Sequence, residues 1–177
     1  MGKGKKQRIQ EKKKLKQQDD IEDEEWKHID ADELETEEET KELTPAEQAF
    51  IDYGFNKLNK SDLFKRIKET EEIDEIIALT GSQDEDVRLK ACREMCPCHV
   101  KSDREEFWNA IISLANDDSE TIRYQVLHNL CDGSPPHLED KVIETLEIFN
   151  RDSSQKIRRK AHQVMGAYLH SGEWNVM

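Results

Sequence analysis

Cysteine and histidine side chains, which can bind metals or act as nucleophiles, cluster in two short stretches of this 177-residue sequence. The first stretch ends with Cys-Pro-Cys-His, and the second lies about 35 residues further along the chain. The six side chains are Cys92, Cys96, Cys98, His99, His128 and Cys131. Zinc is bound by such thiolates and imidazoles when four of them come within tetrahedral reach.

Core packing is the simpler interpretation of these thiols. Cys96 and Cys131 are 35 residues apart. On stacked helices their backbones would therefore lie roughly 8–10 Å apart, too far for a disulfide and marginal for one shared metal. Cys92 stands 35 residues before Leu127, which is an aliphatic position. A buried cysteine at such a position packs as a small hydrophobe.

A metal site is the alternative interpretation. Pro97 breaks a helix, so we expect Cys98 and His99 to face a loop. The side chains that could then bind a metal are Cys96, Cys98, His99 and Cys131. We nevertheless expect no bound metal, no cofactor and no catalytic activity. The sequence contains no glycine-rich phosphate loop, no nucleophile elbow and no carboxylate pair framed by a pocket signature.

The 35-residue spacing recurs in the aliphatic residues and in the arginines, so it belongs to the elements that carry these side chains. Four sets of residues repeat at this spacing: Val87, Ile122 and Ile157; Arg88, Arg123 and Arg158; Ala91, Val126 and Ala161; Met95, Leu130 and Met165. A fixed period of this length is typical of an array of helical repeats. Each repeat is expected to consist of two helices.

The helices can be placed from their caps and from their apolar periodicity. We expect the first helices of the repeats at 71–80, 104–116 and 138–150, with loops between repeats at 97–103 and 132–137. Thr44, Pro45 and Glu47 have the arrangement of a capping box that starts an earlier helix. The apolar side of that helix would be formed by Phe50, Ile51, Phe55 and Leu58. A second helix would be capped at Ser61–Asp62, and the last helix would end near Gly172.

The run Asp-x-x-x-x-Ile/Val-Arg, followed by small and aliphatic residues, resembles the HEAT repeat over about residues 71–170. The resemblance and the period together imply an all-α fold, a short right-handed α-solenoid of about three helix pairs. Residues 44–70 would form a helical cap at its N-terminal end, and 71–177 would hold the three repeats and a short C-terminal arm. The family generally supplies interaction scaffolds, and some members are lyases.

In the HEAT family, a turn aspartate and an arginine of the second helix form a ladder between neighbouring repeats. The matching pairs here are Asp117 with Arg123 and Asp152 with Arg158. The first repeat departs from the pattern, because Ser82 stands where Arg88 would need an aspartate. The resemblance therefore implies a ladder that is complete only in the later repeats.

The outward positions of the second helices are the predicted partner-binding surface. These positions are mainly long and basic, and in a helical solenoid the second helices line the concave side. The residues are Leu89, Lys90, Arg93, Tyr124, Gln125, His128, Arg159, Lys160 and Gln163. They would suit an acidic or extended partner, although a solvated charged face is an equally ordinary explanation.

Residues 1–43 form a charged tail that we expect to be disordered, because it has too few apolar residues to offset chain entropy. Its basic part spans 3–16 and its acidic part spans 19–42. The basic side chains are Lys3, Lys5, Lys6, Arg8, Lys12, Lys13, Lys14 and Lys16. They have the form of a nuclear-import or nucleic-acid-binding patch, with a plain solvated tail as the alternative. The acidic part could lie along the basic surface and compete with a partner.

Composition narrows the function further. The formal net charge of −13 disfavours unspecific binding to nucleic acid or to anionic membranes. No apolar run reaches the roughly 20 residues that cross a bilayer, and no secretory signal is recognisable. We expect a cytoplasmic protein, or a nuclear one in a eukaryote, that acts as a non-catalytic adaptor or scaffold for another protein. The alternatives are a nucleic-acid- or ribosome-associated protein that uses the basic tail, and a HEAT-like lyase.

Overall fold

The structure is a computed structural model that describes residues 42–176. The predictions for the basic and acidic parts of the tail lie outside these residues. Within 42–176 all regular secondary structure is helical, which confirms the all-α fold class. None of the helices in this range is both long and apolar enough to cross a membrane.

Three helix pairs make up residues 73–171. The first pair is α4 (Ile73–Leu79) with α5 (Glu85–Glu94), the second is α6 (Glu105–Ser113) with α7 (Glu120–Gly133), and the third is α8 (Glu139–Asn150) with α9 (Gln155–Ser171). A 3-10 turn, η3 (Leu114–Asn116), extends α6, and another, η4 (Pro136–Leu138), leads into α8. The predicted first helices therefore lie where the apolar period placed them. The loop after α7 is shorter than predicted, since Asp132 and Gly133 still belong to that helix.

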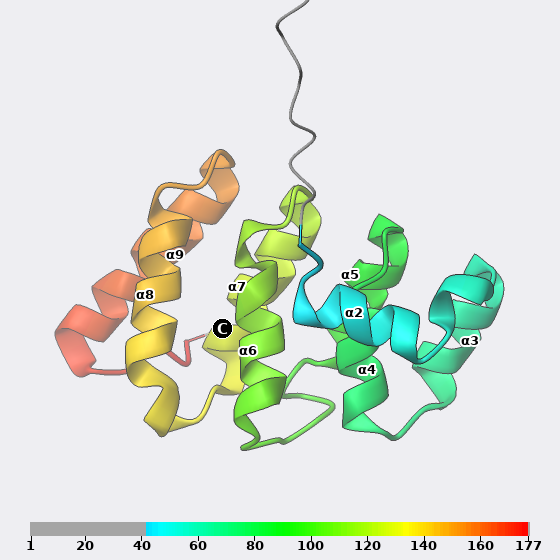
Figure 1. Ribbon diagram of the computed structural model, residues 1–177. Coiled ribbons are helices and arrows are strands. Elements are labelled where there is room, and N and C mark those ends of the chain that lie inside the picture. The colour runs from blue at the N-terminus through cyan, green and yellow to red at the C-terminus, as the bar shows by residue number, and fades with distance from the viewer. Residues whose placement is uncertain (1–41, 177) are drawn as a thin grey trace, which may run out of the picture. The chain divides into compact units, whose positions relative to one another are not determined.

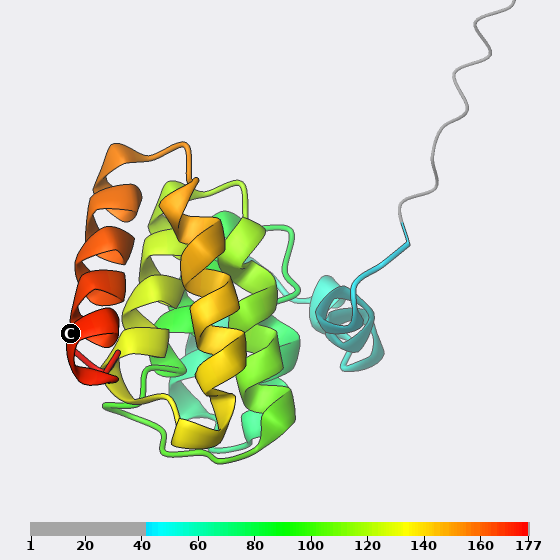
Figure 2. The same ribbon diagram turned by 90° about the vertical axis from the view of Figure 1, so that its left-hand side faces the viewer.

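The first helices α4, α6 and α8 form one row, and the second helices α5, α7 and α9 form another beside it (Figures 1 and 2). α7 packs between α5 and α9, and α6 packs against α4. The repeated aliphatic positions fill the space between the rows, because residues four apart fall on one face of a helix. Val87, Ile122 and Ile157 are all completely buried.

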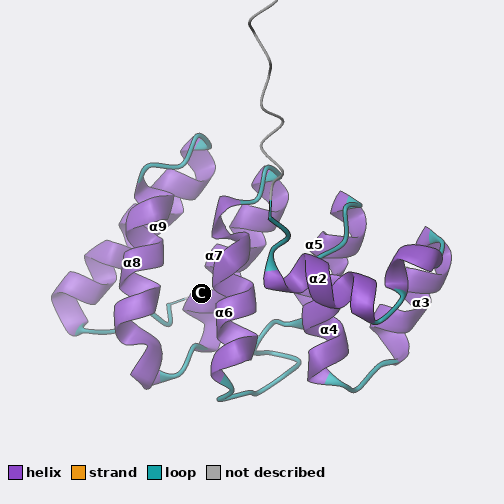
Figure 3. Ribbon diagram, in the orientation of Figure 1, coloured by secondary structure: helices purple, strands orange, loops and turns teal. Residues whose placement is uncertain are grey.

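The N-terminal helix α2 (Pro45–Asp52) begins as predicted. The Thr44 side chain accepts from the backbone of Glu47 and the Glu47 side chain accepts from the backbone of Thr44, which completes the capping box. The helix ends earlier than predicted, because Gly54 adopts a left-handed φ of 73°. A separate 3-10 turn, η2 (Phe55–Lys57), follows (Figure 3).

The break at Gly54 changes which side chains are buried in this region. Phe50 and Phe55 meet edge to face in the core, with ring centroids 5.7 Å apart. Ile51 and Leu58 are exposed. The prediction of one continuous helix with all four residues on its apolar side is therefore wrong.

The next helix, α3 (Lys60–Glu69), covers the outer side of α5. Its cap is Asn59, whose side-chain oxygen accepts from the backbone of Asp62 at 3.0 Å. The predicted cap at Ser61–Asp62 was placed too late in the sequence. Leu63 and Ile67 are buried and pack in one apolar cluster with Val87 of α5.

The C-terminal helix α9 ends at Gly172, as predicted, with a left-handed φ of 74°. The short arm after it turns back onto the chain between α7 and α8. Trp174 is buried there, and its indole Nε1 donates to the Ser134 hydroxyl at 2.7 Å. The Ser134 hydroxyl in turn donates to the carbonyl of Leu130 at 2.6 Å, so the arm is fixed to the end of α7.

Candidate functional site

A row of arginine–carboxylate contacts connects the three helix pairs at the turns between first and second helices. Arg88 of α5 donates through Nε and Nη2 to both oxygens of Asp117, at 2.8 and 3.1 Å. Arg123 of α7 makes the same two contacts with Asp152, at 2.7 and 3.0 Å. Asp117 and Asp152 are only 7% and 4% exposed, so both pairs are largely shielded from water. Such forked contacts are strong and directional.

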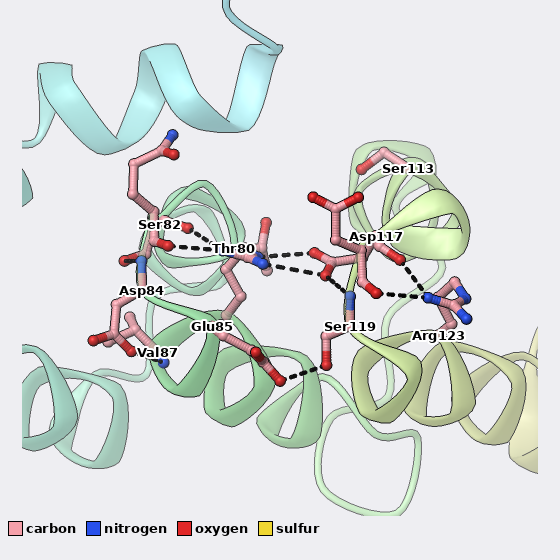
Figure 4. Close-up of polar contacts among 12 residues, drawn as sticks. Thr80, Ser82, Asp84, Glu85, Val87, Ser113, Asp117, Ser119 and Arg123 are labelled. Atoms are coloured by element: carbon pink, nitrogen blue, oxygen red, sulfur yellow. Dashed lines mark hydrogen bonds and ion pairs between the residues drawn. The ribbon is translucent and has the colours of Figure 1, made fainter.

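The pairing differs from the one predicted. Each carboxylate receives the arginine of the preceding helix pair and not the arginine that follows it in its own pair. The arginine of the same pair binds the backbone instead: Arg123 donates through Nη1 to the carbonyls of Asp117 and Asp118, at 2.8 and 2.9 Å (Figure 4). That contact leaves Nε and Nη2 directed toward the next pair, where Asp152 lies.

The serine at position 82 does not prevent Arg88, the arginine of the same helix pair, from making its backbone contacts. Arg88 donates through Nη1 to the carbonyls of Ser82 and Gln83, at 3.0 and 3.1 Å, as Arg123 does one pair later. The Ser82 hydroxyl also accepts from the backbone of Asp84 at 3.2 Å, which replaces the turn contact made elsewhere by the aspartate. The serine therefore keeps the turn but offers no carboxylate to a preceding arginine.

A serine–glutamate hydrogen bond accompanies each arginine–aspartate pair. These hydrogen bonds were not predicted from the sequence. Ser119 donates to Glu85 at 2.6 Å (Figure 4), and Ser154 donates to Glu120 at 2.8 Å. The four residues obey the same 35-residue period, so the period was the signal that could have found them.

Arg158 occupies the last position of the row and differs from the other two arginines. Its Nη1 donates to the carbonyls of Asp152 and Ser153, at 2.5 and 2.8 Å, so the guanidinium is held in place. No carboxylate among residues 42–176 pairs with its Nε and Nη2. The side chain is half-buried and therefore still reachable.

Hydrogen bonding between the partners shifts the pKa values of Asp152, Arg88 and Arg123, against the opposing effect of burial. Hydrogen bonds from Arg123 are the main reason that the pKa of Asp152 is lowered. The hydrogen bond with Asp117 raises the pKa of Arg88 in the same way. The pair of Arg123 and Asp152 is therefore ionised at neutral pH.

The predicted partner-binding residues separate into two groups in the structure. Arg93, Arg159 and Gln163 are exposed, whereas the others are half-buried. Several half-buried ones already have partners within the fold. The half-buried residues are Leu89, Lys90, Tyr124, Gln125, His128 and Lys160.

Several side chains of the predicted partner-binding surface already contact other residues of the chain, so fewer of them are available to bind another protein. The Lys156 ammonium lies 3.7 Å from the centre of the Tyr124 ring, and the Lys90 ammonium lies 5.4 Å from the centre of the Phe64 ring. Gln125 donates to the buried Asn129 at 2.8 Å. Helix α9 carries four lysine and arginine residues, Lys156, Arg158, Arg159 and Lys160, and no acidic residue.

The Cys-Pro-Cys turn packs against the C-terminal end of α7. Cys96 Sγ lies 2.6 Å from Cys98 Sγ, 3.7 Å from His128 Nε2 and 3.5 Å from Asp132 Oδ2. The donor atoms of Cys96, Cys98 and Asp132 all lie within 4.8 Å of one another. A cleft of about 470 Å³ opens beside them, lined in part by Cys98, Asp132 and Trp108.

Two members of this group, Cys96 and Cys98, are among the candidates that the sequence indicated, whereas the other two candidates lie elsewhere. Cys131 is completely buried in the main core cluster, and His99 is exposed. Neither belongs to the group of close donor atoms found among residues 42–176. Asp132 was missed, because the loop was predicted to begin at this residue, whereas α7 carries it one turn after His128.

Burial keeps three thiols, those of Cys92, Cys96 and Cys131, protonated. Burial and the hydrogen bonds with Cys98 and Asp132 raise the pKa of Cys96 to about 12. Burial also raises the pKa values of Cys92 and Cys131 to about 12. Without a metal, Cys92, Cys96 and Cys131 are therefore poor nucleophiles at neutral pH.

Comparisons of the chain with protein-family models, with curated proteins and with solved structures found no match. The functional argument therefore depends on the geometry described above.

Proposed function

We propose that this chain is a non-catalytic interaction module, a short HEAT-like α-solenoid that binds an acidic segment of another protein. The segment would lie along the exposed side of the second helices and place a carboxylate on Arg158. The same proposal makes the chain a cytoplasmic scaffold, since four unpaired cysteines suit a reducing compartment.

The main support for the proposal is that Arg158 has two guanidinium nitrogen atoms, Nε and Nη2, that pair with no carboxylate among residues 42–176. The two preceding arginines each hold a carboxylate with the same two nitrogen atoms that Arg158 leaves unused. Its guanidinium is already positioned by two backbone carbonyls, so little side-chain entropy is lost when a carboxylate binds. A forked guanidinium selects a carboxylate over other acceptors by its geometry.

The charge around Arg158 favours an acidic partner over a second copy of this chain. Lys156 and Arg159 are exposed on the same helix. A second copy stacked end to end would present Ser82 at the equivalent position, and a serine supplies no carboxylate. The occupant is therefore expected to be an acidic segment of a different protein.

Binding of a labelled acidic peptide to the full-length chain tests this function. The probe is a fluorescein-labelled peptide rich in Asp and Glu, and its affinity is measured by fluorescence anisotropy at two salt concentrations. We expect binding that weakens with salt, because exposed charges are screened. The unlabelled peptide of residues 19–42, added in trans, should compete with the probe, since it is also acidic.

Two arginine-to-lysine variants form the matched comparison. R158K keeps the positive charge but loses the fork, so we expect the dissociation constant to rise about tenfold. R151K makes the same change at an exposed arginine at the end of α8, and its affinity should stay that of the wild type. Equal affinities for R158K and R151K, or salt-independent binding, would contradict the proposal.

A further inference from the structure

A cluster of polar and sulfur-containing side chains surrounds Cys96 between the first and second helix pairs. Neither the proposed interaction nor core packing explains this cluster. Core packing accounts for Cys92 and Cys131, which are completely buried among apolar side chains. Cys96 is also buried, but its Sγ faces three polar or sulfur groups: Cys98, His128 and Asp132. Cys98 lies exposed at the edge of the neighbouring cleft.

We propose that Cys96, Cys98, His128 and Asp132 form a binding site for one zinc ion that fastens the turn after α5 onto α7. The four donors are two thiols, an imidazole and a carboxylate, and zinc accepts all three types. A site closed by four protein ligands is typical of structural rather than catalytic zinc.

The local fold supplies these donors in two pairs. His128 and Asp132 are four residues apart on α7, so they project from the same side of that helix. Cys96 and Cys98 belong to a tight turn, in which the backbone of His99 donates to the carbonyl of Cys96 at 2.8 Å. Pro97, between the two cysteines, packs so close to α7 that a Cβ added at Gly133 would lie 2.9 Å from its Cβ.

The distances from Cys96 suit tetrahedral zinc. Bond lengths of about 2.3 Å to sulfur and about 2.1 Å to nitrogen or oxygen imply about 3.6 Å between a sulfur and a nitrogen or oxygen ligand. Cys96 Sγ lies 3.7 Å from His128 Nε2 and 3.5 Å from Asp132 Oδ2. Two sulfur ligands should be about 3.8 Å apart, so the exposed Cys98 side chain must move outward by about 1 Å from its 2.6 Å contact. His128 Nε2 lies outside the group whose donor atoms are all within 4.8 Å of one another, so the imidazole ring must also turn toward the other donors.

Binding requires no oxidant or other reactant. Zn²⁺ replaces the protons of the two thiols, which are released to solvent, and the imidazole and carboxylate bind through lone pairs. The ion would add a cross-link at the C-terminal ends of α5 and α7, whereas the arginine row joins the two helix pairs at the turns before these helices.

The test uses the full-length chain, purified without a histidine tag, stripped with a chelator and kept reduced. Zinc chloride alone is the probe, followed by metal analysis after gel filtration. We expect one zinc per chain. Cobalt substituted for zinc should give the visible absorption of a tetrahedral thiolate site, which a purely structural role of these residues would not produce.

Single substitutions separate the proposed ligands from their neighbours. C98S and D132N should each weaken zinc binding by at least about 100-fold, more than residues that merely support a ligand, and H128Q by at least about tenfold. H99Q and C131A are the matched controls, and both should retain wild-type affinity. C98S changes an exposed side chain, so its folding, checked by circular dichroism, should be unaffected.

Three results would overturn the proposal. One is the absence of stoichiometric zinc after the stripped chain is reloaded. Another is a loss of binding in H99Q or C131A as large as that in C98S. The third is formation of a Cys96–Cys98 disulfide in air with no protection by zinc, which would make the pair a redox couple.

Discussion

The buried carboxylate of Asp152 joins the third helix pair to the second through Arg123. It is 4% exposed and receives both forked nitrogens of Arg123, which is itself only 11% exposed. D152N should lower the free energy of unfolding by about 3 kcal/mol, because it leaves a buried guanidinium without its charge partner. Chemical denaturation measures the effect.

A surface pair between α6 and α8 provides the control for D152N. Lys141 contacts Glu105 at 2.7 Å, but the two side chains are 39% and 66% exposed. E105Q should therefore destabilise the protein much less than D152N, because solvent screens an exposed ion pair. Similar losses in D152N and E105Q would mean that burial of the arginine row adds nothing to stability.

The lowered pKa of Asp152 also makes the free energy of unfolding depend on pH. The hydrogen bonds from Arg123 lower the pKa of Asp152 below its value in the unfolded chain, about 3.9. The stabilisation is therefore complete above that value and is lost as pH falls through the lower pKa of the folded state. The unfolding free energy of the wild type should decrease between about pH 5 and pH 2. This decrease should be smaller in D152N.

Close contact between two backbones determines how the N-terminal helix meets the repeats. A Cβ added at Gly81, after α4, would lie 2.1 Å from the carbonyl oxygen of Ala46 in α2. G81A should therefore displace α2 and reduce stability by more than about 1 kcal/mol. Thermal unfolding and fluorescence of the neighbouring aromatic residues can follow the change.

Gly166 in α9 is the matched control for this substitution. A Cβ added there meets nothing within 4 Å. G166A should raise the free energy of unfolding by up to about 1 kcal/mol, because alanine favours helix more than glycine. If G81A were as stable as G166A, the close approach of α2 to the first repeat would not persist in solution.

Elements that recur along the chain could be predicted well from the sequence, whereas elements that occur once could not. The second helices share three apolar positions and an arginine. A helix that is ambiguous in one copy can therefore be placed by comparison with the other two. The region of Gly54 has no second copy, and its apolar residues fit a helical pattern even though the backbone turns there. Local patterns do not reveal such a break when the flanking residues favour helix.

The candidate sites were predicted less completely than the helices, because they depend on contacts between repeats. The sequence indicated the correct arginines and aspartates, but the partner of each one lies 29 residues away in the neighbouring helix pair. The cluster around Cys96 likewise depends on a contact between repeats, because Cys96 follows α5 and Asp132 lies on α7. Side-chain direction across an interface follows from packing, which the period alone does not specify.

At the scale of the whole molecule, each helix pair contacts mainly its neighbours, so its stability should vary along the row. Trp174 lies at the C-terminal end, where its ring meets Tyr168 edge to face and its Nε1 binds Ser134. W174A removes this packing and should cost about 3–5 kcal/mol of local stability. Amide hydrogen exchange should then lose protection in α8 and α9 while α4 and α5 keep theirs. L169A, which truncates a side chain that is 80% exposed, should leave the exchange pattern unchanged. A uniform loss across all helices in W174A would show instead that residues 42–176 unfold as one cooperative unit.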